Sequence, residues 1–111
     1  MHAVHNADAP RFTIAEGRER YLAHTDSLMT VVIDFHDGPH AQPDPPHHHP
    51  HEQVTYVAAG ELLFFVGEEE YRLSAGDLIA VPSNVPHTIQ ILTPHVRLVD
   101  SFNPIREEFL K

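Results

Sequence analysis

The chain has 111 residues, 16 of them acidic and only 7 basic, a formal charge of −9 at neutral pH, and no cysteine. This length is enough for one domain with its own core, and the missing cysteines exclude disulfides and thiolate ligands and suit a reducing compartment. Nucleic acids and anionic membranes are bound through clustered Lys and Arg, so neither is an expected partner.

Residues 1–10 are expected to form a flexible N-terminal arm, because they show no hydrophobic period and few bulky apolar groups. They also lack the basic-then-apolar order of a signal peptide. No later segment approaches the roughly 20 apolar residues of a membrane span. We therefore expect a cytoplasmic protein whose single folded domain covers residues 11–111.

The first half of that domain reads as short strands. Residues 12–14 and 20–24 flank a turn at Glu16-Gly17-Arg18. Over residues 28–35 every second residue is apolar, with Thr30 and Asp34 on the opposite face, which is typical of a half-buried strand.

A loop rich in proline and histidine follows at residues 36–46. Its prolines lack the N–H that a sheet needs, so we expect it outside any ladder. His36 and His40 are expected on the loop surface rather than as metal ligands.

The second half also reads as strands. Residues 54–58 precede a Gly60-Glu61 turn and the run Leu-Leu-Phe-Phe-Val at 62–66, whose two faces should both avoid water. One face would fill a barrel and the other would meet a second sheet or subunit, which favours a homodimer. Further strands are expected over residues 71–73, 77–81, 87–92 and 96–102. Short strands with frequent turns indicate an all-β sandwich or barrel, with a helical turn only at 104–110.

The densest cluster of candidate ligands lies where the loop enters a strand. Along an extended chain alternate side chains point the same way, so His47, His49 and Gln53 can face one point. Neutral imidazoles and an amide oxygen are ligands for a transition metal. His48 would face away, whereas His51 shares the spacing and is either an alternative ligand or a contact behind His49.

Two segments, residues 47–60 and 76–91, resemble the two sequence motifs of the cupin family. The first reads His-x-His-x3-Gln-x6-Gly, with glutamine where most cupins carry glutamate. The second places Gly76, Pro82 and His87 at the family's spacing, with Asn84 where glycine is usual and Ile91 where the family has asparagine. Asparagine is well suited to replace glycine at positive φ. The resemblance covers roughly residues 28–102 and implies a double-stranded β-helix, or jelly-roll barrel. It also implies that His87 joins the other ligands on one divalent metal.

The last strand carries a carboxylate on its apolar face. Val96, Leu98, Asp100 and Phe102 alternate with polar neighbours, so Asp100 should be carried inside. A buried carboxylate is costly unless it is paired, bound to metal or poised to titrate. It is therefore either a functional acid or the partner of Arg106 in an ion pair.

Residues 98–110, taken with His-Pro-His-Glu-Gln in the first motif, are similar to the end of small cupins that act in pectin and alginate breakdown. Those cupins convert cyclic unsaturated uronate monomers into the linear keto form. The resemblance implies three histidines and a glutamine as metal ligands, and an aspartate, an aromatic residue and an arginine as catalytic residues. In this chain these are His47, His49, Gln53 and His87 for the metal, and Asp100, Phe102 and Arg106 for catalysis.

The resulting hypothesis is a metal-dependent isomerase acting on a small anionic sugar. Asp100 would move the proton, Arg106 would bind the carboxylate, and Phe102 would form an apolar wall. The metal is left open among Ni, Zn, Fe and Mn. Two alternatives remain: a mononuclear non-haem iron dioxygenase, and a non-catalytic sugar- or metal-binding cupin.

Overall fold

The computed structural model of the chain describes residues 2–110, so Met1 and Lys111, the outer ends of the expected arm and barrel, lie outside the described residues. Within this range every expected strand is present, with bounds that differ by at most two residues. The elements are β1 (Phe12–Ala15), β2 (Arg18–His24), β3 (Met29–Phe35), β4 (Glu52–Ala59), β5 (Glu61–Val66), β6 (Glu69–Ser74), β7 (Leu78–Val81), β8 (His87–Ile91), β9 (Val96–Asn103) and a short 3₁₀ helix, η1 (Glu107–Leu110).

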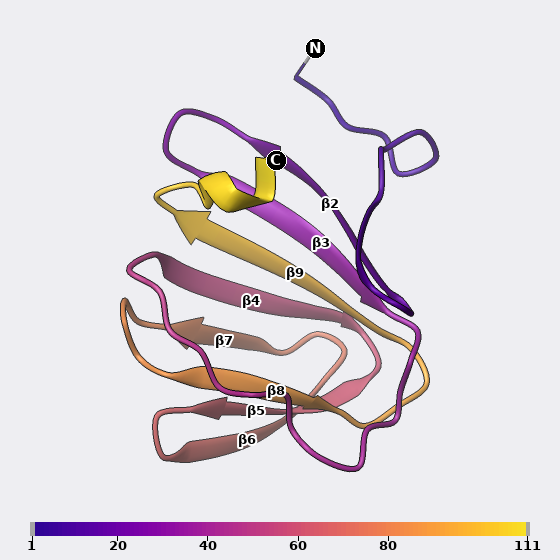
Figure 1. Cartoon of the computed structure of the whole chain (residues 1–111), viewed down its shortest axis with the longest axis vertical. Coiled ribbons are helices and arrows are strands. Elements are labelled where there is room, and N and C mark those ends of the chain that lie inside the picture. Colours follow the sequence, from indigo (N-terminus) through magenta and orange to yellow (C-terminus); the bar gives the residue numbers. More distant parts are fainter. Residues whose placement is uncertain (1, 111) are drawn as a thin grey trace.

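The strands form two antiparallel sheets. One has six strands in the order β1-β2-β3-β9-β4-β7, and the other has three in the order β6-β5-β8 (Figure 1). The main core cluster takes buried side chains from both sheets, so their inner faces pack on each other. The all-β jelly-roll barrel expected from the sequence is confirmed. No helix among residues 2–110 is long and apolar enough to cross a membrane.

Strict alternation along β4 and β9 carries polar groups into the barrel. Gln53, Thr55 and Val57 are buried, while the residues between them are exposed. β9 lies beside β4 and buries every second residue from Val96 to Phe102. Thr55 stands opposite Asp100 in the register of these strands. The prediction that Asp100 is carried inside is therefore confirmed.

The structure corrects the expectation for residues 62–66. Leu62 and Phe64 on β5 are buried, but Leu63 and Phe65 are only half-buried. β5 is the middle strand of the three-stranded sheet, so only its inward face meets the six-stranded sheet. The apolar run therefore buries only the face of Leu62 and Phe64, rather than both faces.

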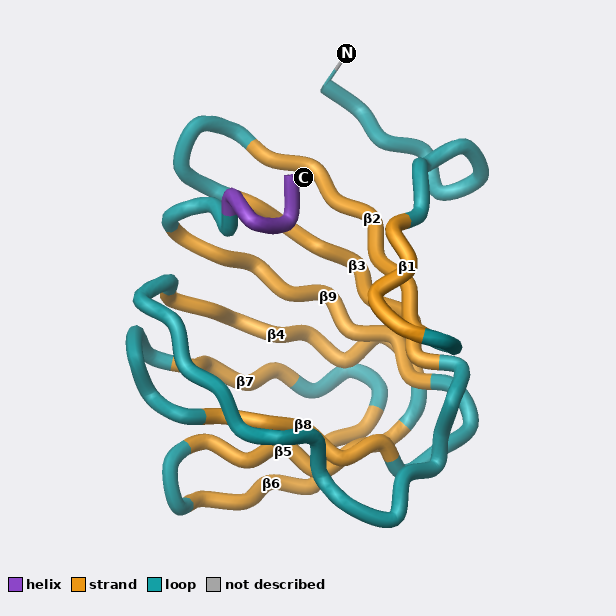
Figure 2. Tube along the Cα trace, viewed as in Figure 1, coloured by secondary structure: helices purple, strands orange, loops and turns teal. Residues whose placement is uncertain are grey.

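The proline-rich loop at residues 36–46 forms no strand of either sheet, as predicted, but backbone hydrogen bonds still tie it and the following His47 to β8. The N–H groups of His40, Asp44 and His47 donate to carbonyl oxygens of β8 at 2.8, 3.0 and 3.0 Å. These three residues fall between the prolines and therefore keep the donors that the prolines lack. Figure 2 shows the loop running alongside β8. A bridge between His47 and His87 ends this run.

Asp34 is the buried polar residue of β3. It is only 3% exposed, although the sequence placed it opposite the strand's apolar face. Arg97 on β9 donates to both of its carboxylate oxygens at 3.0 Å, and His95 lies 2.8 Å from one of them. Burial opposes its ionisation, but these hydrogen bonds outweigh that effect and lower the pKa of Asp34. The carboxylate therefore ties β3 to β9.

Candidate active site

Three histidines converge at one end of the barrel. Nitrogen atoms of His47, His49 and His87 all lie within 4.8 Å of one another. The first two come from the end of the proline-rich segment, and His87 begins β8. The backbone bridge between His47 and His87 brings segments 40 residues apart in sequence together, with their ring centroids 4.3 Å apart.

Backbone hydrogen bonds orient two of these rings. Nδ1 of His87 lies 2.9 Å from the carbonyl oxygen of Val85, and Nδ1 of His49 lies 3.0 Å from that of His51. Each Nδ1 must therefore carry the proton, which leaves Nε2 with a free lone pair. Nε2 of His87 is buried and has no hydrogen-bond partner among residues 2–110. A cation would satisfy this buried acceptor.

Gln53 completes the arrangement. Its amide nitrogen donates to Thr55 Oγ1 at 2.9 Å, which turns its oxygen toward Nε2 of His49 at 3.2 Å. Both nitrogens of His49 then face acceptor oxygens, and a neutral imidazole can donate to only one. A metal ion held by His49 and Gln53 would remove this conflict, because it would accept lone pairs from both side chains.

The protonation of the histidines also fits a metal. Burial, followed by repulsion from His87 and His49, lowers the pKa of His47 to about 4. Burial likewise lowers the pKa values of His49 and His87. Neutral imidazoles offer lone pairs, and three of them with one amide oxygen suit a divalent transition metal. The predicted set of His47, His49, Gln53 and His87 therefore fits the expected ion.

The remaining histidines of the loop lie outside this set. His51 acts through its backbone oxygen, which orients His49; its own ring is not part of the converging group. His48 and His36 are exposed. His40 is not a free surface residue, because its ring contacts Asp37 at 2.9 Å and Arg18 at 3.3 Å.

A second group, Asp34, His36 and His95, also brings three candidate ligand atoms together, and the sequence did not indicate it. The rings of His36 and His95 are stacked with centroids 4.8 Å apart. Arg97 already neutralises Asp34 through two hydrogen bonds, so the carboxylate of this group is taken up by an ion pair between β3 and β9.

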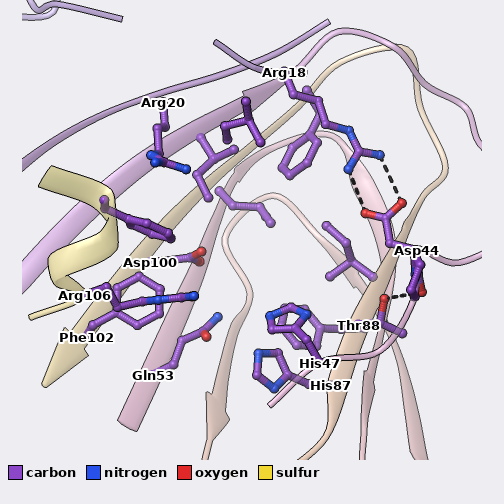
Figure 3. Close-up of a pocket in the computed structure, with 18 residues that line it drawn as sticks. Arg18, Arg20, Asp44, His47, Gln53, His87, Thr88, Asp100, Phe102 and Arg106 are labelled. Atoms are coloured by element: carbon purple, nitrogen blue, oxygen red, sulfur yellow. Dashed lines mark hydrogen bonds and ion pairs between the residues drawn. The ribbon is translucent and has the colours of Figure 1, made fainter. Parts of the chain in front are cut away.

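A cavity of about 480 Å³ adjoins the three-histidine cluster. Six of the seven predicted site residues line it: His47, Gln53, His87, Asp100, Phe102 and Arg106. Figure 3 shows Asp100, Arg106 and Gln53 on one side and the imidazoles of His47 and His87 on the other. A cavity of this size accommodates a small-molecule ligand.

Two carboxylic acids line this cavity: Asp44, which Arg18 binds, and Asp100, which lies beside the histidine cluster. Asp100 is 6% exposed and accepts a hydrogen bond of 2.7 Å from the hydroxyl of Thr55. Burial raises its pKa to about 6, against the opposing effects of Thr55 and Arg106. The ion pair with Arg106 considered from the sequence is not formed, since Arg106 binds Glu108 at 2.9 Å. Asp100 is therefore free to exchange a proton near neutral pH.

Phe102 and Arg106 form the wall beside Asp100. Phe102 is buried and meets the His49 ring edge-on at 5.8 Å. The guanidinium carbon of Arg106 lies 5.1 Å from the centroid of Phe102 and 4.3 Å from that of Phe109 on η1. The short C-terminal helix thus holds the arginine over the cavity.

Sequence reasoning missed three residues of this site. Thr55 links Gln53 to Asp100, and Arg18 and Arg20 on β2 line the cavity. The alternation Arg-Glu-Arg at residues 18–20 places both arginines on one face, a signal that was available. Which face pointed inward was not, because β1 and β2 lack a clear apolar pattern.

Known proteins resemble this chain over most of its length. It is 32% identical over 93 residues to the pectin degradation protein KdgF of Dickeya dadantii (strain 3937), which covers 84% of this chain and 83% of that protein. The crystal structure of an RmlC-like cupin from Shewanella frigidimarina NCIMB 400 matches with a TM-score of 0.88 and 33% identity, over 98% of this chain and 96% of that one. The structure of KdgF from Halomonas sp. matches with a TM-score of 0.84 and 30% identity, over 94% of each chain.

The cupin-domain family matches residues 33–100, which is more than half of the chain. This range includes all four candidate metal ligands. Since fold, motif spacing and sequence relatives agree, the chain belongs to the cupin family.

Proposed function

We propose that this cupin is a metal-dependent isomerase that opens the ring of unsaturated uronate monomers, giving the linear 4-deoxy-5-keto uronate. One observation carries the proposal: a buried acid of raised pKa and an arginine share a cavity with three of the four neutral candidate ligands, His47, Gln53 and His87. The similarity to two KdgF proteins, one of them described as a pectin degradation protein, supports an acidic sugar as substrate.

The neutral ligand set determines what a metal would contribute. A divalent cation bound by His47, His49, Gln53 and His87 would keep its positive charge and draw electron density from a substrate oxygen. Among the side chains proposed to take part in the reaction, only Asp100 would gain and lose a proton.

Asp100 is proposed to move one proton from oxygen to carbon. As a carboxylate it takes the proton of the C1 hydroxyl while the bond between C1 and the ring oxygen breaks, so that C1 becomes an aldehyde. The electron pair passes to the ring oxygen, leaving an enolate at C4 and C5. Asp100 then returns the proton to C4, and C5 becomes a ketone. A pKa of about 6 suits both roles, because acid and base forms are both accessible.

The other two residues are proposed to position the sugar. The guanidinium of Arg106 lines the cavity, and its fork matches a substrate carboxylate. Phe102 presents an apolar edge that limits how the ring can lie. Orientation of this kind accounts for a large part of enzymatic rate enhancement.

The test is to incubate metal-loaded protein with freshly released unsaturated galacturonate and to follow loss of its ultraviolet chromophore. Asp100→Asn should lower kcat by about 100-fold or more with metal content unchanged, and Arg106→Ala should chiefly raise KM. His87→Ala should lose bound metal as well as activity. Wild-type rates in both Asp100→Asn and Arg106→Ala would end the proposal. Oxygen uptake would instead favour a dioxygenase, and binding without chromophore loss would favour a binding module.

A further inference from the structure

Two arginines of β2 reach the same cavity but differ in their partners. Arg18 and Arg20 both line it, as their spacing of two along a strand requires. Arg18 donates to both carboxylate oxygens of Asp44, at 2.8 and 3.2 Å, and to Asp37 at 3.2 Å. These hydrogen bonds raise the pKa of Arg18 and neutralise it within the protein.

Arg20 has no such carboxylate. It is 8% exposed, and its Nε is buried without a hydrogen-bond partner among the residues that the structure describes. Its guanidinium carbon lies 4.4 Å from the ring centroid of Phe12 and 4.0 Å from that of Phe109. Burial lowers the pKa of Arg20, and the positive charge of Arg106 lowers it further, while the carboxylate of Glu108, which Arg106 binds, opposes them only in part. A buried cation whose near neighbour is another cation is costly unless an anion joins it.

Arg106 lies beside the same aromatic ring. Its guanidinium carbon is 4.3 Å from the centroid of Phe109, so this one side chain contacts both arginines. Figure 3 shows Arg20 and Arg106 on either side of Asp100 in this view. Because burial raises the pKa of Asp100, its carboxyl group is ionised less readily and only weakly balances the charge of the two arginines. Glu108 forms an ion pair with Arg106 at 2.9 Å, so one carboxylate faces two guanidinium groups, and the end of the cavity next to η1 keeps one positive charge in excess.

We propose that Arg20 is a second anion-binding residue of the cavity and that it holds, together with Arg106, the carboxylate of an acidic sugar. The identity of the sugar rests on the proposed function; the anion site rests on the burial and lack of a partner of Arg20. Two planar guanidinium groups stacked on aromatic rings are held in place before the ligand arrives, so little entropy is lost on binding.

A purely structural role for Arg20 makes a different prediction. If the guanidinium only fills the space between Phe12 and Phe109, its removal lowers stability but does not change the preference for an anion. The discriminating comparison is between D-galacturonate and its methyl ester, which have nearly the same shape and differ by one charge. Neither is consumed by ring opening, because both lack the C4–C5 double bond.

The experiment measures calorimetric affinities of both sugars for metal-loaded wild type, Arg20→Met and Arg20→Lys. Methionine keeps apolar volume and removes the charge, and we expect it to weaken galacturonate binding by about 10- to 100-fold while leaving the ester unchanged. Lysine keeps the charge but not the fork and should show a smaller loss. Arg11→Met is the matched control, since Arg11 stacks on Tyr21 at 4.0 Å outside the cavity and its loss removes the same charge.

An unchanged preference for the acid in Arg20→Met, or no preference in wild type, would overturn the inference. Should Arg20→Met fail to fold, Arg20→Gln and Arg20→Lys give the same comparison. The two proposals fail separately. If acid binding depends on Arg20 but the unsaturated uronate is not turned over, only the ring-opening function is contradicted. If the uronate is turned over and its KM is the same in wild type and Arg20→Met, only the role of Arg20 is contradicted.

Discussion

Thr55 is the residue that joins the two halves of the candidate site. It is fully buried, accepts a hydrogen bond from the Gln53 amide at 2.9 Å and donates one to Asp100 at 2.7 Å. A single hydroxyl therefore turns the amide oxygen toward the histidines and also stabilises the ionised form of the acid. Only a side chain with both a donor and an acceptor can do this.

Replacing Thr55 with Val keeps the shape and removes both bonds. Because the Thr55 hydrogen bond lowers the pKa of Asp100, we expect the acidic limb of the kcat/KM profile to move up by about one pH unit. The freed Gln53 amide should also weaken metal affinity by about 10-fold. A pH–rate series and a metal titration measure the two effects. Thr55→Ser keeps the hydroxyl and should behave like wild type; an unaltered profile in Thr55→Val would contradict the link.

At the scale of elements, residues with positive φ form the turns between β4 and β5, between β6 and β7, and between β7 and β8. Gly60 has a φ of +82°, and a Cβ there would clash with the carbonyl oxygen of His95. Gly76 has a φ of +99° with nothing within 4 Å of such a Cβ. Asn84, which replaces the usual glycine of the second motif, has a φ of 61°, as predicted from its tolerance of this region. The motif residues without ligand atoms thus shape turns.

These two glycines give a matched pair of substitutions. Gly76→Ala should cost about 1–2 kcal/mol, because only the left-handed conformation is strained. Gly60→Ala should cost about 1–3 kcal/mol more, since the β4–β5 turn must also move away from His95. Urea unfolding curves of both variants and wild type measure the difference. Equal losses would mean that the close approach to His95 does not constrain the turn.

For the molecule as a whole, Asp100 links folding to pH. Its pKa is raised from 3.8 to about 6 in the folded state, so the folded protein holds this proton more tightly than the unfolded chain. In metal-free protein the contribution of Asp100 to the unfolding free energy should therefore fall as pH rises from below about 4 to above about 6, by on the order of 3 kcal/mol in all. Denaturant titrations of wild type and Asp100→Asn check this: the difference between the two should follow that slope. A pH-independent difference would show that Asp100 has an ordinary pKa.

The homodimer stays a prediction, but the structure moves its expected interface. The outer face of β5 is half-buried, whereas Val54, Tyr56 and Leu78 on β4 and β7 are exposed, Leu78 by 65%. Tyr56 and Leu78 are direct neighbours, and β7 is an edge strand. We expect a second copy of the chain to cover this face.

Leu78→Lys should therefore convert a dimer into a monomer, since a charge would be buried at the interface. Light scattering at several protein concentrations measures the mass. Leu28→Lys is the control, because Leu28 is also half exposed but lies away from β4 and β7. A monomeric wild type, or a dimeric Leu78→Lys, would contradict this interface. The cytoplasmic location likewise stays a prediction.

The sequence by itself determined the all-β fold and the shared direction of His47 and His49, because alternation is a local property of an extended chain. That His87 joins them was implied by the resemblance to the cupin motifs, and the tertiary structure brings it there through a bridge to His47. The sequence also placed Asp100 inside, since β9 alternates without interruption. Only the tertiary structure decided the partners: Arg18 with Asp44, Asp34 with Arg97, Gln53 with Thr55, and Arg20 with none among the described residues. Except for the Gln53–Thr55 pair, these side-chain partnerships join residues that are distant in sequence. Local periodicity sets which way a side chain points, and the packing of the two sheets sets what it meets.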